Sequence, residues 1–177
     1  MGEWYCSVMD TTYQIAYGSS MEDVRRLRDR LETLVTHHPL YHTGGYDSAK
    51  AYMVLTELNR RGQLVYFYTL TGILVGVVGF TIQESLEWWS SSDKKTLIEL
   101  TVMGFPVPES RGFGRVAAEF LMEFAKYNGC SYIVSGTFLG SNNSYKRVGK
   151  EAGYSEIYEY PVYLCHVGGE DENNGDR

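Results

Sequence analysis

The chain has 177 residues, of which 44% are hydrophobic and 21% are charged, and its formal net charge is −6. This length and composition fit one globular domain with a sizeable core, and they exclude two ordinary domains or a largely disordered chain. The acidic balance argues against a nucleic-acid binder that works through a broad basic surface.

The cysteines and the hydropathy pattern indicate a cytoplasmic protein. Cys6, Cys130 and Cys165 are widely spaced and form no CxxC pair. An odd number of cysteines without a signal peptide indicates reduced thiols. No apolar run approaches the length of a transmembrane helix, so we expect a soluble protein of the cytoplasm.

The first third of the chain predicts a strand followed by two helices. Residues alternate over Tyr13–Tyr17, as in a short strand, and apolar residues then recur at helical spacing over Met21–Thr36. Ser20 and Asp23 come close to a capping box at the start of this helix. A second helix is predicted over Asp47–Asn59. The arginines of the first helix are expected to form a solvated face: Arg25, Arg26, Arg28 and Arg30.

The middle of the chain predicts a hairpin of two strands. The runs Gln63–Leu70 and Ile73–Gln83 are rich in β-branched and aromatic residues, and Thr71-Gly72 separates them. A polar excursion, Glu84–Lys95, follows. Its Trp88-Trp89 pair is either partial core or, if exposed, a surface for a partner or a homodimer.

The second half predicts a strand over Leu97–Met103, a helix over Val116–Tyr127, a strand over Ser131–Phe138, a further helix, and a strand pair near Glu156–His166. A right-handed crossover makes the first two of these strands parallel. The whole order predicts an α/β (α+β) fold, a mixed, mainly antiparallel sheet flanked by helices. We expect one domain over residues 1–167 and a disordered acidic tail over residues 168–177, which has no apolar residue to bury.

The turn before the helix Val116–Tyr127 has the composition of an anion site. It reads Pro108-Glu109-Ser110-Arg111-Gly112-Phe113-Gly114-Arg115. The first N–H groups of a helix have no partner inside the helix, and the macrodipole adds a partial positive charge. Glycines let the backbone approach a phosphate, and the two arginines can donate charge-assisted hydrogen bonds. The turn therefore predicts phosphate binding; a turn that serves only the fold is the alternative.

This arrangement resembles the GCN5-related N-acetyltransferase superfamily. The resemblance rests on the strand, turn, helix and strand just described, together with Asn142 and the pair Gly153-Tyr154. In the superfamily the turn reads Arg or Gln, two residues, Gly, one residue, then Gly or Ala. Arg111 and Gly114 match this pattern, whereas the last position is Val116. The short, Tyr-rich chain also looks similar to small acyltransferases found in bacteriophage genomes.

The resemblance implies an N-acyltransferase that uses acetyl-CoA as co-substrate, with the pantetheine arm between two splayed parallel strands. The turn would bind the diphosphate, and main-chain groups at the strand end would pair with the pantetheine amides. Asn142 would touch the pantetheine or the thiol end, although it is also a plausible N-cap. The cofactor-binding residues predicted in this way are Met103, Gly104, Phe105, Arg111, Gly112, Phe113, Gly114, Arg115, Val116 and Asn142.

Glu99 is the candidate general base. It precedes Arg111 by twelve residues, near the spacing at which related enzymes place a carboxylate for this role. Strand alternation predicts that its side chain shares a face with those of Leu97, Thr101 and Met103. The alternative is a rim residue that faces water.

Tyr145 is the candidate general acid. Many members of the superfamily place a Tyr four residues before the Gly-aromatic pair, but here that position is Gly149. Tyr145 lies one helical turn earlier on the same face. A structural or acceptor-site role for Tyr145 is the alternative, and the thiolate would then leave without a protein acid.

The acceptor is expected to be an amine of a small molecule or peptide. The resemblance implies that variable loops build its pocket, here His37–Tyr46, Gln83–Lys95 and the last strand pair. The three histidines of the first loop have no further ligand nearby, so no metal site is predicted. The acidic charge favours a cationic acceptor.

Two other functions remain open. Gly149 and Val116, which depart from the family pattern, favour an acyltransferase-like fold without catalysis that serves as a binding or host-interaction module. The likeness to bacteriophage proteins suggests a relative of enzymes that modify DNA bases, although the acidic charge argues against it.

Overall fold

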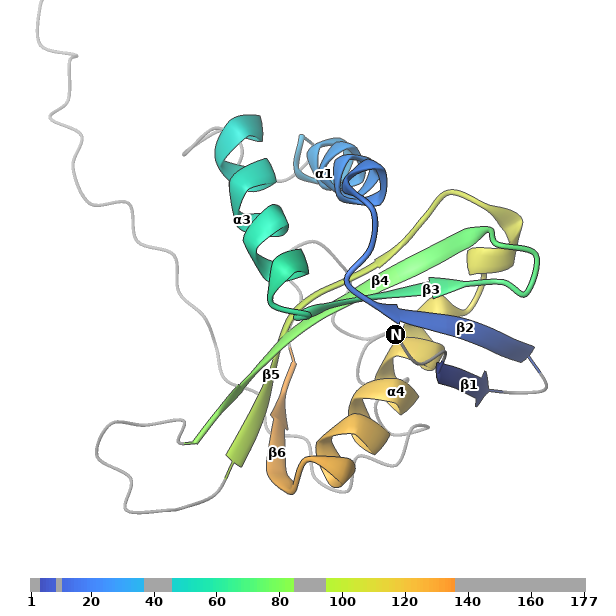
Figure 1. Ribbon diagram of the computed structural model, residues 1–177, viewed down its shortest axis with the longest axis vertical. Helices are drawn as coiled ribbons and strands as arrows, with labels where there is room; N and C mark the ends of the chain where they lie inside the picture. Colours follow the sequence, from blue (N-terminus) through green and yellow to red (C-terminus); the bar gives the residue numbers. More distant parts are fainter. Residues whose placement is uncertain (1–3, 9–10, 37–45, 85–94, 136–177) are drawn as a thin grey trace, which may run out of the picture.

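A six-stranded sheet forms the centre of the computed structural model, which describes residues 4–8, 11–36, 46–84 and 95–135 (Figure 1). The strands lie in chain order: β1 (Trp4–Val8), β2 (Thr11–Tyr17), β3 (Leu64–Tyr68), β4 (Leu74–Gln83), β5 (Lys95–Gly104) and β6 (Cys130–Val134). Neighbouring strands are antiparallel except β5 and β6, which are parallel. The predicted mixed, mainly antiparallel sheet and the parallel crossover are both confirmed.

Helices cover both faces of this sheet (Figure 1). They are α1 (Met21–Val35), α3 (Ser48–Arg60), the short 3-10 helix η1 (Pro108–Ser110) and α4 (Phe113–Tyr127). The caps explain where the first two begin: the Ser20 side chain accepts from the Asp23 N–H, and the Asp47 side chain accepts from the Lys50 N–H. No helix in the described ranges combines the length and the apolar character needed to cross a membrane.

The sheet separates two hydrophobic clusters. The cluster under α4 is rich in aromatic rings, and Phe67 meets Phe113 and Phe120 edge to face at centroid distances of 5.3 and 5.2 Å. The cluster under α1 and α3 contains Val24 and Leu27, both fully buried. Residues of β4 and β5 belong to both clusters, so the turn that follows β5 leaves from strands that are packed on both faces.

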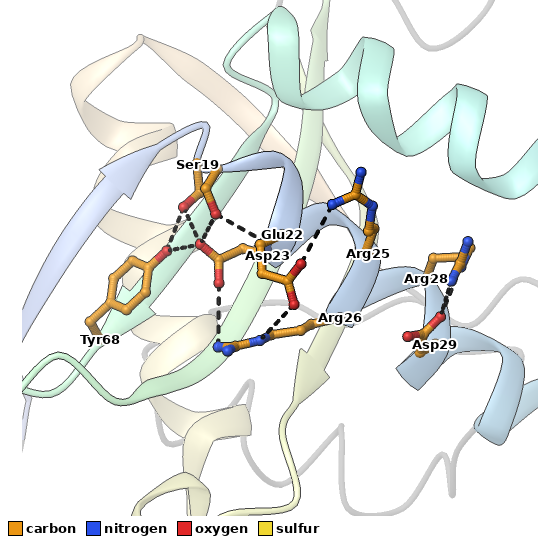
Figure 2. Close-up of polar contacts among 9 residues, drawn as sticks. Ser19, Glu22, Asp23, Arg25, Arg26, Arg28, Asp29 and Tyr68 are labelled. Carbon is orange, nitrogen blue, oxygen red and sulfur yellow. Dashed lines mark hydrogen bonds and ion pairs between the residues drawn. The ribbon is translucent and has the colours of Figure 1, made fainter.

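A polar network joins the start of α1 to the end of β3 (Figure 2). The Tyr68 hydroxyl lies 2.6 Å from the Ser19 hydroxyl and donates to the Asp23 carboxylate at 3.1 Å. Ser19 also donates to Asp23 at 2.7 Å. Burial is the main reason why the pKa of Tyr68 rises to about 12. The Tyr66 hydroxyl, two residues away, is buried and has no hydrogen-bond partner within the described residues.

β1 was not predicted from the sequence. Its register with β2 runs from Trp4 opposite Ile15 to Val8 opposite Thr11, so the two strands form a hairpin. The connecting residues Met9-Asp10 carry none of the Asn-Gly or Gly-containing signals that mark a two-residue hairpin. The pairing therefore depends on the strands themselves and not on a recognisable turn.

A β-bulge in β5 overturns the predicted side-chain alternation. Gly79 pairs with Thr101 and Phe80 with Glu99, which leaves Leu100 as the extra residue on β5. An extra residue exchanges the two faces for the rest of the strand. Leu97 accordingly packs under α4, whereas Met103 packs under α1 and α3. The prediction that Leu97, Glu99, Thr101 and Met103 share one face is therefore wrong.

Candidate functional site

The turn between β5 and α4 carries the predicted anion site. After Gly104 the chain forms η1 and then reaches Gly112, which is the N-cap of α4 and has a φ of 85°. This left-handed conformation is one that glycine adopts at little cost. Gly112 therefore lets the chain turn sharply from η1 into the first turn of α4.

Several amides of the turn remain available to a ligand. Three amides already donate to carbonyl groups inside the turn: Ser110 to Val107 (3.0 Å), Arg111 to Pro108 (3.2 Å) and Arg115 to Gly112 (2.9 Å). For the successive amides of Gly112–Gly114, no acceptor is found among the residues that the structure describes. These are the unpaired N–H groups that the start of a helix offers to an anion.

No described residue packs against the Cα atoms of Gly112 and Gly114. A Cβ atom placed on Gly114 would meet no described atom within 4 Å, and its φ is not in the left-handed region. Glycine inside a helix costs about 1 kcal/mol relative to alanine. Neither backbone conformation nor packing against the described residues explains this glycine, and its predicted contact with a ligand stays a prediction.

The side chains of Phe113 and Val116 hold the turn to the core. Phe113 is 3% exposed, and its ring lies directly over Gly76, where an added Cβ would come within 2.3 Å of it. Val116 is 6% exposed and belongs to the same cluster under α4. Both were predicted to bind the cofactor, and the structure leaves only their backbone groups for that purpose.

The two arginines of the turn differ in exposure. Arg111 is exposed, whereas Arg115 is half-buried in the first turn of α4. Arg111 therefore has the freedom to meet an anion that approaches from solvent. Both remain candidates to donate charge-assisted hydrogen bonds to a diphosphate.

At the end of β5, Gly104 faces the edge that has no partner strand among the described residues. The Phe105 N–H donates to the Val75 carbonyl at 2.9 Å, and the Phe105 carbonyl accepts from the Val107 N–H at 2.8 Å. This bonding makes Gly76 and Gly104 a pair whose own polar groups point away from each other. Of the predicted positions Met103, Gly104 and Phe105, the structure therefore turns only Gly104 toward the edge where pantetheine amides would pair.

Glu99 lies where that open edge begins. Within the described residues β6 pairs with Lys95–Ile98 of β5, so Glu99 is the next residue along the strand. It is half-buried and lies opposite Phe80, on the face that α4 covers. Glu99–Gly104 pairs with β4 on one side, and on its other side β6 provides no partner strand within the described residues.

Other predicted features lie outside the described residues. They are Tyr145, Asn142, the loop with His37, His38 and His42, the pair Trp88-Trp89, the later part of the strand that β6 begins, and the tail 168–177. Their roles stay predictions, and so does the splay of β5 and β6.

The sequence interpretation missed two residues of the site, Gly76 and Arg30. An isolated glycine inside a strand pattern marks a close approach of another group, and Gly76 carried that signal. Arg30 donates its Nε–H to the Gly104 carbonyl at 3.3 Å. No local pattern reveals this contact, because the two residues are far apart in the sequence.

Several solved structures with a similar fold are named as acetyltransferases. The aminoglycoside N-acetyltransferase AAC(6')-Iy, in complex with the bisubstrate analogue CoA-S-monomethyl-acetylneamine, has a TM-score of 0.59 at 15% identity, over 88% of this chain and 99% of that chain. AAC(6')-Ih from Acinetobacter baumannii has a TM-score of 0.57 at 12% identity, over 88% and 99% of the two chains. A possible acetyltransferase from Clostridium difficile 630 has a TM-score of 0.61 at 11% identity, over 89% and 99%.

The fold is that of the GCN5-related N-acetyltransferases. No protein-family model and no curated protein matches the sequence. Identities of 11–15% show that the GCN5-related N-acetyltransferase fold is shared, and they leave the activity to be argued from this chain's own residues.

Proposed function

We propose that this protein is an acyl-CoA-dependent N-acyltransferase that moves an acetyl group from acetyl-CoA to an amine. The observation that carries the proposal is the row of amides at Gly112–Gly114, which have no acceptor among the described residues. No described atom lies within 4 Å of a Cβ placed on Gly112 or Gly114. Such a row fits a diphosphate. AAC(6')-Iy, which shares the fold, is bound to CoA in one of its structures and to a CoA-containing analogue in another.

The open edge of β5 connects the proposed diphosphate site to the proposed catalytic residue. Among the described residues, this edge has no partner strand after Ile98, and it runs to Gly104, just before the turn. A pantetheine arm that follows this edge would carry its thioester from the turn toward Glu99. An unpaired strand edge offers the main-chain groups that amides of such an arm require.

The reaction needs a neutral amine, a polarised carbonyl and a stabilised leaving group. The amine nitrogen attacks the thioester carbon in a ternary complex, a C–N bond forms and the C–S bond breaks. Glu99 accepts the proton that the amine loses. The thiolate of CoA takes up a proton from Tyr145 or from water.

The proposed acceptor is a cationic amine such as an aminoglycoside, a polyamine or a basic peptide. The net charge of −6 attracts cations to the surface and repels anions. Two of the solved structures with this fold are named as aminoglycoside acetyltransferases. A homodimer through the Trp88-Trp89 pair remains a prediction from the sequence.

Cofactor binding is tested first. We expect mass spectrometry of the purified protein to find co-purified acyl-CoA, and calorimetry to show saturable CoA binding. Charge reversal in Arg111→Glu should weaken the affinity at least about tenfold, because charge-assisted hydrogen bonds to the diphosphate are lost. Lys126→Glu changes the net charge equally at the far end of α4 and should have little effect. A wild-type protein that binds no acyl-CoA would remove the proposal.

Catalysis is tested with a panel of amines and acetyl-CoA. Glu99→Gln should lower kcat by about 10²–10⁴-fold, the usual contribution of a general base, while the affinity for CoA changes little. Glu123→Gln removes an exposed carboxylate from α4 and serves as the matched control. If the wild-type protein binds CoA but acetylates none of the amines, the protein is a binding module on this fold.

A further inference from the structure

The arginines of α1 do not share one role. Three of them lie beside carboxylates of their own helix, as Figure 2 shows: Arg25 with Glu22 (3.5 Å), Arg26 with Glu22 (3.8 Å) and Asp23 (3.7 Å), and Arg28 with Asp29. Arg30 has no carboxylate within ion-pair distance in the described part of the chain. Its Nε–H donates instead to the Gly104 carbonyl on β5.

The sequence pattern placed Arg30 on a solvated face, and that prediction is wrong. The side chain of Arg30 is half-buried and reaches from α1 to the open edge of β5. Gly104 is the residue that turns its own N–H and C=O toward this edge. Arg30 therefore holds the carbonyl of the same residue whose N–H faces this edge.

The guanidinium keeps hydrogen-bonding capacity after this contact. It has five N–H donors in a planar fork, and the contact with Gly104 uses only the one on Nε. The charge is not neutralised by a described carboxylate, in a chain whose net charge is −6. The Arg30 guanidinium lies next to the proposed path of an anionic cofactor. Its positive charge and its remaining N–H donors attract oxygen acceptors on that cofactor.

We propose that Arg30 is a cofactor-positioning residue, an inference that rests on the acyl-CoA site proposed above. By holding the Gly104 carbonyl, Arg30 keeps the Gly104 N–H turned toward the pantetheine arm. Its two terminal amino groups donate to an oxygen of the bound acyl-CoA, on the arm or on the diphosphate. Helix α1 thereby contributes Arg30 to the proposed cofactor site, in addition to the residues of the turn before α4.

The test compares Arg30→Met and Arg30→Lys with Arg25→Met in the full chain. Arg25 lies on the same helix, is exposed and pairs with Glu22, so its loss is a matched control. We expect Arg30→Met to weaken CoA binding by about tenfold or more in calorimetry, the effect of losing a charged hydrogen bond. Arg30→Lys should recover part of this loss, because it keeps the charge. Arg25→Met should bind CoA within about twofold of the wild-type protein.

Two further measurements separate positioning from general stability. Thermal unfolding without ligand should differ little between Arg30→Met and Arg25→Met, and the KM for acetyl-CoA should rise much more than kcat falls. Titration with pantetheine, which lacks the phosphates, locates the acceptor oxygen. A loss that appears with CoA alone assigns the contact to the phosphates, and a loss with both ligands assigns it to the arm.

Equal CoA affinities for Arg30→Met and Arg25→Met would overturn the inference and leave the proposed function intact. A wild-type protein that binds no acyl-CoA would instead remove the proposed function itself. If Arg30→Met does not fold, Arg30→Gln carries the same comparison, since it keeps a polar side chain of similar reach.

Discussion

At the scale of single residues, the missing side chain of Gly76 sets the place of the turn between β5 and α4. The Phe113 ring occupies the space directly above Gly76, and Phe113 is the first residue of α4. The ring also packs edge to face on Phe67, so the start of the helix is tied to β3 and β4 together. A change at Gly76 therefore acts on the turn through the core.

Gly76→Ala tests this coupling. The added methyl group overlaps the Phe113 ring at 2.3 Å, so the ring and the first turn of α4 have to move. We expect a loss of about 1–3 kcal/mol in the free energy of unfolding, typical of an overpacked core. Gly104→Ala lies opposite on β5, where the nearest atom is an ordinary 3.7 Å away, and should be much milder. Urea denaturation of both variants gives the comparison, and equal losses would contradict this account of Gly76.

Tyr68 makes stability depend on pH in the alkaline range. Its pKa in the folded protein rises to about 12 from an ordinary value of 10.0, mainly through burial. Because the folded pKa is the higher one, its contribution is complete below pH 10 and is lost as the pH rises toward 12. We expect the free energy of unfolding to fall across this window.

Tyr68→Phe should flatten this fall, because the side chain no longer titrates. It should also cost about 1 kcal/mol near neutral pH, since the hydrogen bonds to Ser19 and Asp23 are lost. Urea denaturation at several pH values measures both effects. Tyr127→Phe, at a residue that is 85% exposed, is the control that should keep the wild-type slope. An unchanged slope for Tyr68→Phe would show that other groups carry the alkaline dependence.

At the scale of elements, the start of α4 separates a glycine required by the fold from one that is not. Gly112 has a positive φ, whereas Gly114 has neither a positive φ nor a described neighbour that a Cβ would touch. One residue, Phe113, separates the two positions in the same turn. They therefore distinguish a structural reason for glycine from a functional one.

Alanine at each position gives opposite expected results for stability. Gly112→Ala should destabilise the protein by about 1–2 kcal/mol, because alanine is strained in the left-handed region. Gly114→Ala should leave stability unchanged or raise it by up to about 1 kcal/mol through helix propensity. It should nevertheless weaken CoA binding by about tenfold, since the methyl group obstructs the approach of the diphosphate. Normal CoA affinity in Gly114→Ala would mean that no ligand approaches the backbone there.

Strand β5 shows how an irregular element prepares a site. The extra residue Leu100 turns the later part of the strand over, so that Met103 faces α1 and α3 while Leu97 faces α4. Leu100 itself is 45% exposed, which is unusual for a large apolar residue in a central strand. The bulge thus lies next to Glu99, at the point where pairing with β6 ends in the described residues.

At the scale of the whole molecule, ligand binding and folding are linked. A ligand that binds only the folded protein raises its stability by about 2.7 kcal/mol at a concentration one hundred times its Kd. We expect CoA to raise the unfolding midpoint in a concentration-dependent way, and Arg111→Glu to need more CoA for the same shift. Thermal unfolding over a CoA titration measures this. A midpoint that does not move at saturating CoA would contradict the proposed cofactor site.

Local patterns predicted most of the elements. The strands β3 and β4, the hairpin between them and the limits of α1 and α3 follow from short-range alternation, helical spacing and caps at Ser20 and Asp47. These signals act over a few residues, so they are legible in one sequence. β1 was not predicted, because only its pairing with β2 reveals it and no turn signal in the sequence marks the hairpin.

The sequence by itself determined the order of the strands and long helices from β2 to β6, and the Gly- and Arg-containing composition of the turn that leads into α4. The tertiary structure decided which groups of that region are available to a ligand. The side chains of Phe113 and Val116 are buried in the core, and the N–H and C=O of Phe105 are hydrogen-bonded within the protein. Gly104 faces the edge of β5 that has no partner strand among the described residues. The tertiary structure also brought Arg30 to Gly104 across 74 positions of the chain. Such contacts depend on how the sheet and the helices pack, and short-range periodicity in the sequence does not predict that packing.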